Sequence, residues 1–155
     1  MGQSIKPNRP QQTVLIVEDD FLQCEEIAEV LADQGVRVVT AQNGFAAMHA
    51  MRRNRPSVVV LDINLPGLDG LEVAKLMQGL DVVPKLILIS GHSRRITQAH
   101  REDLGAFAIV EKPIMFPVLT RFVLEAMGLD PDELNTGANP GQAPGPTPGT
   151  TPEPA

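Results

Sequence analysis

Carboxylates stand directly after two of the most apolar segments of this chain. Glu18 and Asp19 follow the run 13–17, and Asp62 follows the run 58–61. Short continuous apolar runs suit strands that are buried on both faces of a parallel sheet. The carboxyl ends of parallel strands meet at one edge, where open α/β sheets place their ligand sites. Three carboxylates gathered there would repel one another and raise one another's pKa values, and a divalent cation removes that repulsion.

Two further strand ends carry groups that suit a phosphoryl group. Ser90 follows the apolar run 86–89, and Lys112 lies shortly after the run 106–110. The lysine supplies a point charge and the serine a hydroxyl donor. Mg²⁺, or Mn²⁺ in its place, prefers oxygen ligands and commonly includes phosphate oxygen among them. Because a carboxylate beside such an ion can attack phosphorus and form an acyl phosphate, the residues predict phosphoryl transfer.

Simpler interpretations exist for several polar residues. Asp62, taken alone, could merely cap a turn, and Asp20 reads as a helix cap and not as a ligand. Cys24 falls on the apolar stripe of a predicted helix, which favours core packing over catalysis. His49 and His100 lie on predicted helices without a partner in the sequence, so we expect solvated surface positions.

Five apolar strands alternate with five predicted helices. The strands are expected at 13–17, 36–40, 57–62, 85–89 and 106–110. The helices are expected at 21–34, from 44 to before 56, from 70 to 78, at 94–104 and at 117–127. Asp20 with Gln23, and Asp69 with Glu72, have the spacing of capping boxes. Strict alternation predicts an α/β, flavodoxin-like (βα)5 fold with a parallel sheet of order 2-1-3-4-5.

Length and composition bound the organisation of the chain. The 155 residues suffice for a polar N-terminal arm at 1–12, one domain at 13–128, and a Pro/Gly/Thr-rich tail at 129–155 that we expect to be disordered. A net charge of −6 argues against a nonspecific nucleic-acid binder. No apolar stretch approaches the roughly 20 residues of a membrane span, and the arm lacks the apolar core of a secretory signal. The single cysteine fits a reducing cytoplasm.

Four motifs together resemble the receiver domain of two-component response regulators. They are Val17-Glu18-Asp19-Asp20, the run from Leu61 through Asp62 to Gly70, Ile89-Ser90-Gly91, and Gly105-Ala106 through Glu111-Lys112-Pro113. The resemblance covers about residues 13–128 in the same order and spacing. It implies a stand-alone, phosphorylation-controlled interaction switch in a bacterial cytoplasm. Its implied partners are a sensor histidine kinase or histidine phosphotransfer protein and an unidentified downstream protein.

The resemblance also implies roles for the acidic residues. Asp62 would accept the phosphoryl group from a phosphohistidine. Asp19 and Asp62 would bind Mg²⁺ directly, Glu18 would act through water, and the backbone carbonyl of Asn64 would be a further ligand.

The remaining roles concern the neighbouring strand ends. Ser90 would be the switch hydroxyl, Lys112 would pair with the phosphoryl group, and the bond preceding Pro113 would be cis. Asn64 and His92 occupy the positions that tune the lifetime of the acyl phosphate in this family, although His92 reads equally well as a plain loop residue.

The chain departs from the family pattern on its last strand. The family usually carries Tyr or Phe three residues before the lysine, and Ile109 stands there. Phe107 lies two residues earlier, on the same strand face by a period of two. Either Phe107 substitutes, or coupling between phosphorylation and the output surface is weaker or different.

Two features of the sequence suggest interaction surfaces, and a dimer is a further possibility. Met115 and Phe116 replace a polar cap before the last helix and suggest an apolar docking patch. Arg94, Arg95 and Arg101 form either a solvated helix face or, by the resemblance, part of a partner-binding surface. The sequence leaves open a phosphorylation-dependent dimer through the last helix-strand layers.

Three other interpretations compete with this one. A haloacid dehalogenase-like phosphatase also uses Asp, Mg²⁺, Ser and Lys, but it needs a second Asp where Asn64 stands. A degenerate receiver acting as a constitutive scaffold is suggested only by Ile109. The tail could also be a linker to an output domain outside this sequence.

Overall fold

The computed structural model describes residues 11–132, so most of the predicted arm and tail lies outside the described residues. The strands are β1 (Thr13–Val17), β2 (Arg37–Ala41), β3 (Val58–Asp62), β4 (Lys85–Ser90) and β5 (Ala106–Glu111). The helices are α1 (Phe21–Ala32), α2 (Gly44–Asn54), α3 (Gly70–Met77), α4 (Ser93–Glu102) and α5 (Phe116–Ala126). Among residues 11–132, no helix is both long enough and apolar enough to cross a membrane.

All strands are parallel and lie in the order β2-β1-β3-β4-β5, which confirms the predicted fold and topology. The register keeps the strand tips level. Val17 of β1 pairs with Leu61 of β3, and Asp62 pairs with Ile89 of β4. The residues that follow the strands therefore lie together at the carboxyl edge of the sheet.

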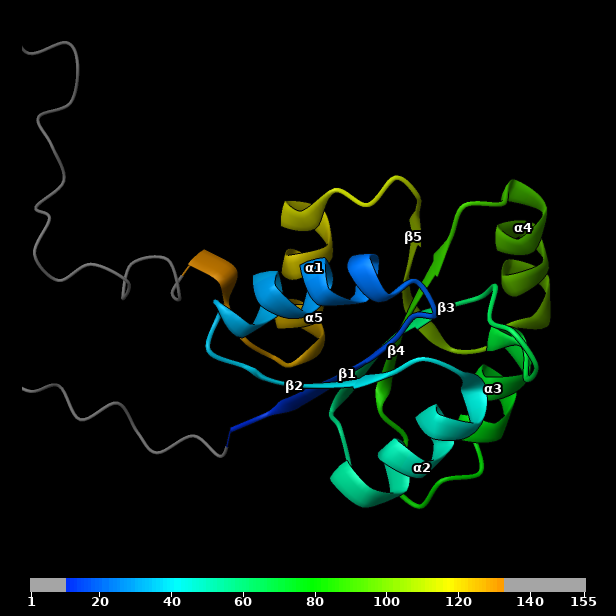
Figure 1. Cartoon of the computed structure of the whole chain (residues 1–155), viewed down its shortest axis with the longest axis horizontal. Helices are drawn as coiled ribbons and strands as arrows, with labels where there is room; N and C mark the ends of the chain where they lie inside the picture. Colours follow the sequence, from blue (N-terminus) through cyan, green and yellow to red (C-terminus); the bar gives the residue numbers. More distant parts are fainter. Residues whose placement is uncertain (1–10, 133–155) are drawn as a thin grey trace, which may run out of the picture.

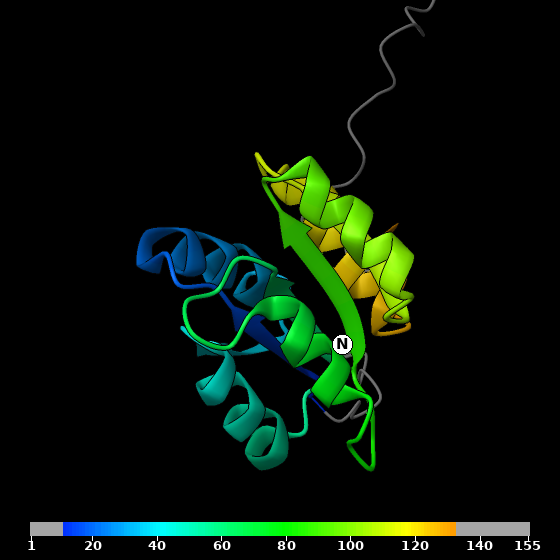
Figure 2. The same ribbon diagram turned by 90° about the vertical axis from the view of Figure 1, so that its right-hand side faces the viewer.

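Helices cover both faces of the sheet (Figure 1). Side chains of α1 and α5 pack with Val14, Ile16 and Val60 on one face, and α2, α3 and α4 cover the other. Figure 2 looks at the side of the molecule on which α3 and α4 lie. Leu129, assigned to the tail by the sequence, packs against the α1–α5 cluster. The central strands β1 and β3 are fully buried, as their continuous apolar sequence predicts.

The predicted capping boxes have different outcomes. The Asp20 carboxylate accepts a hydrogen bond from the backbone N–H of Gln23 at 3.2 Å, which confirms Asp20 as the cap of α1. Asp69 does occupy the N-cap position of α3, but the predicted capping hydrogen bond is wrong, because its side chain makes none and pairs instead with Arg95 of α4. The ion pair with Arg95 therefore forms in place of the capping hydrogen bond that the spacing of Asp69 and Glu72 predicted.

A β-bulge separates Phe107 from the position it was expected to share with Ile109. Leu86 pairs with Ala106 and Ile87 with Ala108, so Phe107 is skipped in the register. As a result Ala106 and Ile109 pack against the same cluster, three residues apart. Phe107 is 42% exposed and its ring lies 6.0 Å from the Lys85 ammonium, at the opposite end of β4 from Ser90. The expectation that Phe107 and Ile109 share a face by simple alternation is therefore wrong.

We expect Gly70→Ala to destabilise the fold. A Cβ at Gly70 would lie 2.4 Å from the Asp62 carbonyl oxygen and 2.6 Å from the Ile63 Cα, both of them backbone atoms. Relieving such an overlap should cost about 3 kcal/mol of unfolding free energy, measured by urea titration. Gly79→Ala is the matched control, since its Cβ would meet nothing closer than 3.5 Å. Equal losses in the two variants would contradict the close approach at Gly70.

Candidate functional site

Glu18, Asp19 and Asp62 converge at the carboxyl edge of the sheet. Each offers a carboxylate oxygen, and these oxygens all lie within 4.8 Å of one another. Glu18 and Asp62 are 2% and 3% exposed, whereas Asp19 is exposed to solvent. The adjacency of β1 and β3 brings these residues together, because their pairing is in register up to the strand ends. We call these three residues the acidic cluster.

Lys112 brings positive charge to the acidic cluster from the end of β5. Its Nζ lies 2.9 Å from Asp62 Oδ2 and 3.4 Å from Glu18 Oε2. Burial acts to lower the pKa of Lys112, but the hydrogen bond and charge of Asp62, with Glu18 adding to them, outweigh burial and raise that pKa. The lysine is therefore held charged between two buried carboxylates.

Glu18 shows that one lysine does not neutralise the cluster. Burial, followed by the charge of Asp62 and a hydrogen bond with it, raises the pKa of Glu18 from 4.5 to about 7. The Asp20 backbone N–H, which donates to Glu18 Oε1 at 3.2 Å, and the Lys112 charge act in the opposite direction. Near neutral pH the cluster therefore retains a proton for part of the time, and it has room for further positive charge.

Both oxygens of Asp62 have donors. The backbone N–H of Asn64 donates to Oδ1 at 2.9 Å, while Lys112 occupies Oδ2. These contacts fix the carboxylate in one orientation at the tip of β3. Asn64 thus lies beside the acidic cluster, as its spacing predicts.

Ser90 and Pro113 lie on the next two strands. Ser90 is fully buried, and its Oγ accepts a hydrogen bond from the His92 backbone N–H at 3.1 Å. The Lys112 backbone N–H donates to the Ser90 carbonyl at 2.9 Å, which ties the end of β5 to β4. The bond between Lys112 and Pro113 is cis.

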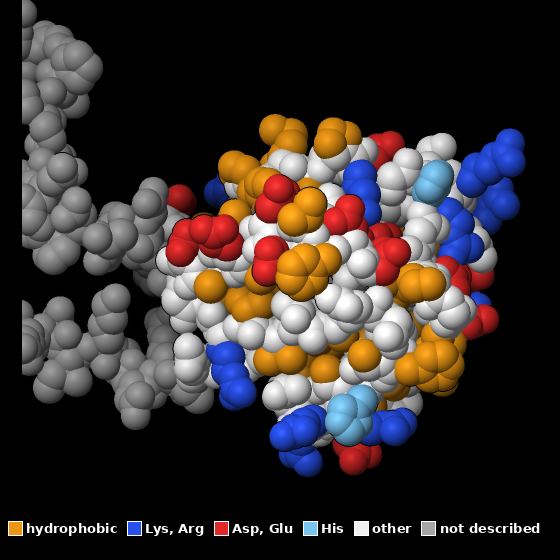
Figure 3. All heavy atoms as spheres, viewed as in Figure 1, with side chains coloured by type: hydrophobic (Ala, Val, Ile, Leu, Met, Phe, Trp, Pro, Cys, Tyr) orange, Lys and Arg blue, Asp and Glu red, His pale blue; other side chains and the backbone are white. Residues whose placement is uncertain are grey.

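A solvent-open hollow of about 530 Å³ lies beside these strand ends. It is lined by Asn64, Gly91, His92, Ser93, Arg94 and Arg95. A Cβ at Gly91 would lie 3.7 Å from Lys112 side-chain carbons, so this residue of the hollow's wall lies close to the lysine side chain. With two arginines and one histidine in its wall, the hollow suits an anion. Figure 3 shows basic side chains gathered over α4 and acidic side chains over α1.

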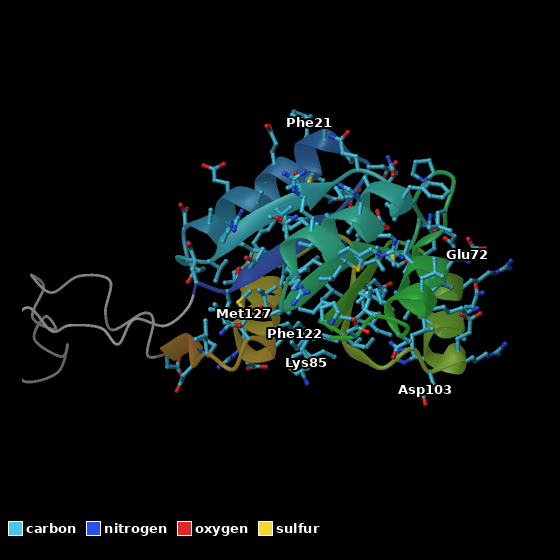
Figure 4. The ribbon with its side chains drawn as sticks, turned by 90° about the horizontal axis from the view of Figure 1, so that it is seen from below. Phe21, Glu72, Lys85, Asp103, Phe122 and Met127 are labelled. Atoms are coloured by element: carbon cyan, nitrogen blue, oxygen red, sulfur yellow. The ribbon has the colours of Figure 1, made fainter. Side chains whose placement is uncertain are left out.

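The structure separates the remaining predicted residues from the acidic cluster. Ile109 packs against the cluster of α2, α3 and α4 and pairs in register with Leu88. Phe107 lies far along the strand with Lys85, which Figure 4 shows at the lower side of the molecule. The ion pair between Asp69 and Arg95 was missed, because 26 residues separate its members and no local pattern marks it.

A family model for the response regulator receiver domain matches residues 14–123. The chain therefore belongs to the response regulator receiver family. Its function class is that of a phosphoacceptor signalling switch in two-component systems.

Curated relatives and solved structures agree with this assignment. The transcriptional regulatory protein AfsQ1 of Streptomyces coelicolor is 35% identical over 107 residues, which cover 69% of this chain and 47% of AfsQ1. Sporulation initiation phosphotransferase F of Bacillus subtilis is 29% identical over 102 residues, covering 66% of this chain and 82% of the relative. The receiver domain of NtrX from Brucella abortus superposes with a TM-score of 0.68 at 28% identity, covering 76% of this chain and 99% of that domain. This chain thus spans about half of one curated relative and most of the other.

The raised pKa of Glu18 predicts a pH dependence of stability in metal-free buffer. The folded protein binds this proton with a pKa of about 7, whereas the model value for an unperturbed Glu is 4.5. Between these values the folded state holds more proton than the unfolded chain, so the free energy of unfolding should fall as pH rises from 4.5 to 7. Urea titrations should show a smaller fall in Glu18→Gln. The exposed Glu25→Gln serves as control, and a wild-type slope in Glu18→Gln would contradict the assignment.

Proposed function

We propose that Asp62 is the phosphoacceptor and that it takes the phosphoryl group from a phosphohistidine of a sensor histidine kinase or histidine phosphotransfer protein. The observation that carries this proposal is the fixed Asp62 carboxylate, whose Oδ2 lies 2.9 Å from Lys112 Nζ inside the acidic cluster. An Asp62 oxygen attacks phosphorus and the P–N bond breaks. The bonding electron pair leaves with the imidazole nitrogen, and an acyl phosphate remains on the protein. Water later cleaves the acyl phosphate and restores the carboxylate.

The oxygen donors at the sheet edge fit a divalent cation. Ligands at about 2.1 Å from an octahedral Mg²⁺ lie roughly 3 to 4.2 Å from one another, a spacing compatible with the 4.8 Å limit of the acidic cluster. Asp19 and Asp62 would bind the ion directly, Glu18 through water, and Asn64 through its backbone carbonyl. Mg²⁺, or Mn²⁺, supplies charge neutralisation at the transferring phosphoryl group. The raised pKa of Glu18 supports this role, since burial and the charge of Asp62 both disfavour its charged form and a bound cation would stabilise that form.

Lys112 and Ser90 would change their hydrogen-bond partners when Asp62 is phosphorylated. Lys112 would pass from the Asp62 carboxylate to the phosphoryl oxygens, keeping the charge paired. The Ser90 hydroxyl, now bonded within its own turn to His92, would turn toward a phosphoryl oxygen. His92 and Asn64 line the hollow beside the strand ends, where their side chains would control the access of water to the phosphoryl group and so its lifetime.

The output surface would lie on the last helix-strand layers and act on a downstream protein. Met115 is 66% exposed and Val118 is 41% exposed at the start of α5, which supports part of the docking patch suggested by the sequence. Phe116 contributes less, because it packs partly against the α1–α5 cluster.

Phe21, at the rim of α1 near the acidic cluster, points outward (Figure 4) and is 58% exposed, a placement that suits the phosphodonor protein.

We expect Asp62→Asn to abolish phosphorylation. Incubation with Mg²⁺ and radiolabelled acetyl phosphate should label the wild type, and the amide of Asn cannot form the acyl phosphate. Asp33→Asn, an exposed acid at the end of α1, is the control and should be labelled like the wild type. Retention of label in Asp62→Asn would assign the phosphoryl group elsewhere.

We expect Asp19→Asn to weaken Mg²⁺ binding by roughly tenfold or more, because a neutral amide replaces a charged ligand. Isothermal titration calorimetry of the full chain would measure the affinity. Asp20→Asn is the matched control, since Asp20 caps α1 and Asn caps equally well. Equal affinities in Asp19→Asn and the wild type would remove Asp19 from the metal site.

A further inference from the structure

Helix α4 is held mainly by polar contacts. Ala99 is its one buried residue, and its Arg95 and Glu102 form ion pairs with Asp69 before α3 and Lys75 of α3. The other helices each bury at least three residues. A helix with so little apolar burial depends strongly on its ion pairs and hydrogen bonds for its position.

Those polar contacts form a chain from the β3–α3 loop to the end of α4. The Arg95 guanidinium pairs with the Asp69 carboxylate through Nη2, and its Nη1 donates to Gln98 Oε1 at 2.8 Å. Gln98 in turn donates to Glu102 at 3.0 Å, and Lys75 of α3 lies 3.3 Å from the same carboxylate. The hydrogen bond from Gln98, followed by Lys75 and Arg95, lowers the pKa of Glu102. We call the pair formed by Asp69 and Arg95 the α4 clasp.

One residue, Asn64, connects Arg95 with Asp62. Arg95 lines the hollow together with Asn64, whose backbone N–H holds Asp62. The Nε–H of Arg95 is buried and has no acceptor within the described part of the chain. An unpaired buried donor is costly, so this group gains from any rearrangement of the guanidinium that gives it an oxygen acceptor.

We propose that Arg95 is a second cation for the phosphoryl group, held in reserve by Asp69. When Asp62 is phosphorylated, Arg95 exchanges the Asp69 carboxylate for phosphoryl oxygens, and the α4 clasp opens. A phosphoryl group carries close to two negative charges near neutral pH and binds guanidinium in a bidentate manner, so it competes well with one carboxylate. This inference rests on the proposed phosphorylation of Asp62.

Opening of the clasp would couple the site to the surface by a route that needs no aromatic switch residue. Ile109 lacks the ring that the family usually carries, and the bulge removes Phe107 from that role. Loss of the contact to Asp69 would detach the first turns of α4 from the β3–α3 loop. The freed Asp69 carboxylate, already at the N-cap position, could then cap α3.

The test follows the full chain with Mg²⁺ and acetyl phosphate by two measurements. Hydrogen exchange of residues 93–102 reports the attachment of α4, and the Arg95 Nε–H resonance, identified by its absence in Arg95→Gln, reports the guanidinium contact. Phosphorylation of the wild type should raise α4 exchange about fivefold and move the Arg95 resonance. Arg94→Gln is the matched control, because Arg94 lines the same hollow but is exposed, and it should keep both responses.

Substitutions at the two residues of the α4 clasp should have different effects on α4 exchange and on the Arg95 resonance. Asp69→Asn should show fast α4 exchange before phosphorylation, yet phosphorylation should still move its Arg95 resonance. Arg95→Gln should show fast exchange that phosphorylation does not change, while Asp62 is still labelled.

The outcomes distinguish this inference from the proposed function. A labelled wild type whose Arg95 resonance stays in place would overturn the role of Arg95 alone, and so would an Arg94→Gln variant that loses both responses. A wild type that takes no label at Asp62 would overturn the proposed function together with this inference.

Discussion

The ammonium of Lys112 lies 2.9 Å from the Asp62 carboxylate. This ion pair stabilises an edge of the sheet where the carboxylates would otherwise repel one another. Two buried carboxylates and a third exposed one are crowded there because the ends of β1 and β3 are level. A single lysine offsets part of the repulsion, and burial together with the charge of Asp62 still raises the pKa of Glu18. This edge of the receiver thus has a deficit of positive charge, which suits the cation and the phosphoryl group proposed to bind there.

The rest of the molecule divides into a rigid support and a weakly attached layer. Strands β1, β3 and β4 are buried between helices, so their tips have little freedom to move. In contrast α4 buries one residue and is held by charged side chains that reach α3 and its preceding loop. Contacts made by charge would respond to the proposed phosphorylation of Asp62, whereas apolar packing would not. The electrostatics of the site therefore have a physical route to the surface that α4 presents.

Sequence patterns predicted the fold and most of the site for a specific reason. Continuous apolar runs such as 58–61 mark buried parallel strands, and parallel strands bring their ends to one edge. The convergence of Glu18, Asp62 and Lys112 follows from topology alone. Two local rules failed. The predicted capping hydrogen bond of Asp69 does not form, because its side chain pairs with Arg95. The predicted alternation of side chains at Phe107 does not hold, because a β-bulge interrupts the strand there.

By itself the sequence determined which elements form, their order in the sheet, and which chemical groups stand at its carboxyl edge. These properties depend on hydrophobic period and strand direction, and both are encoded locally. The tertiary structure decided the raised pKa of Glu18, the partner of Asp69 and the orientation of Phe107. Each of these depends on burial or on contacts between residues far apart in the chain. Such energies arise only when the helices are packed on the sheet, because the distances between charges and the exclusion of water do not exist before then.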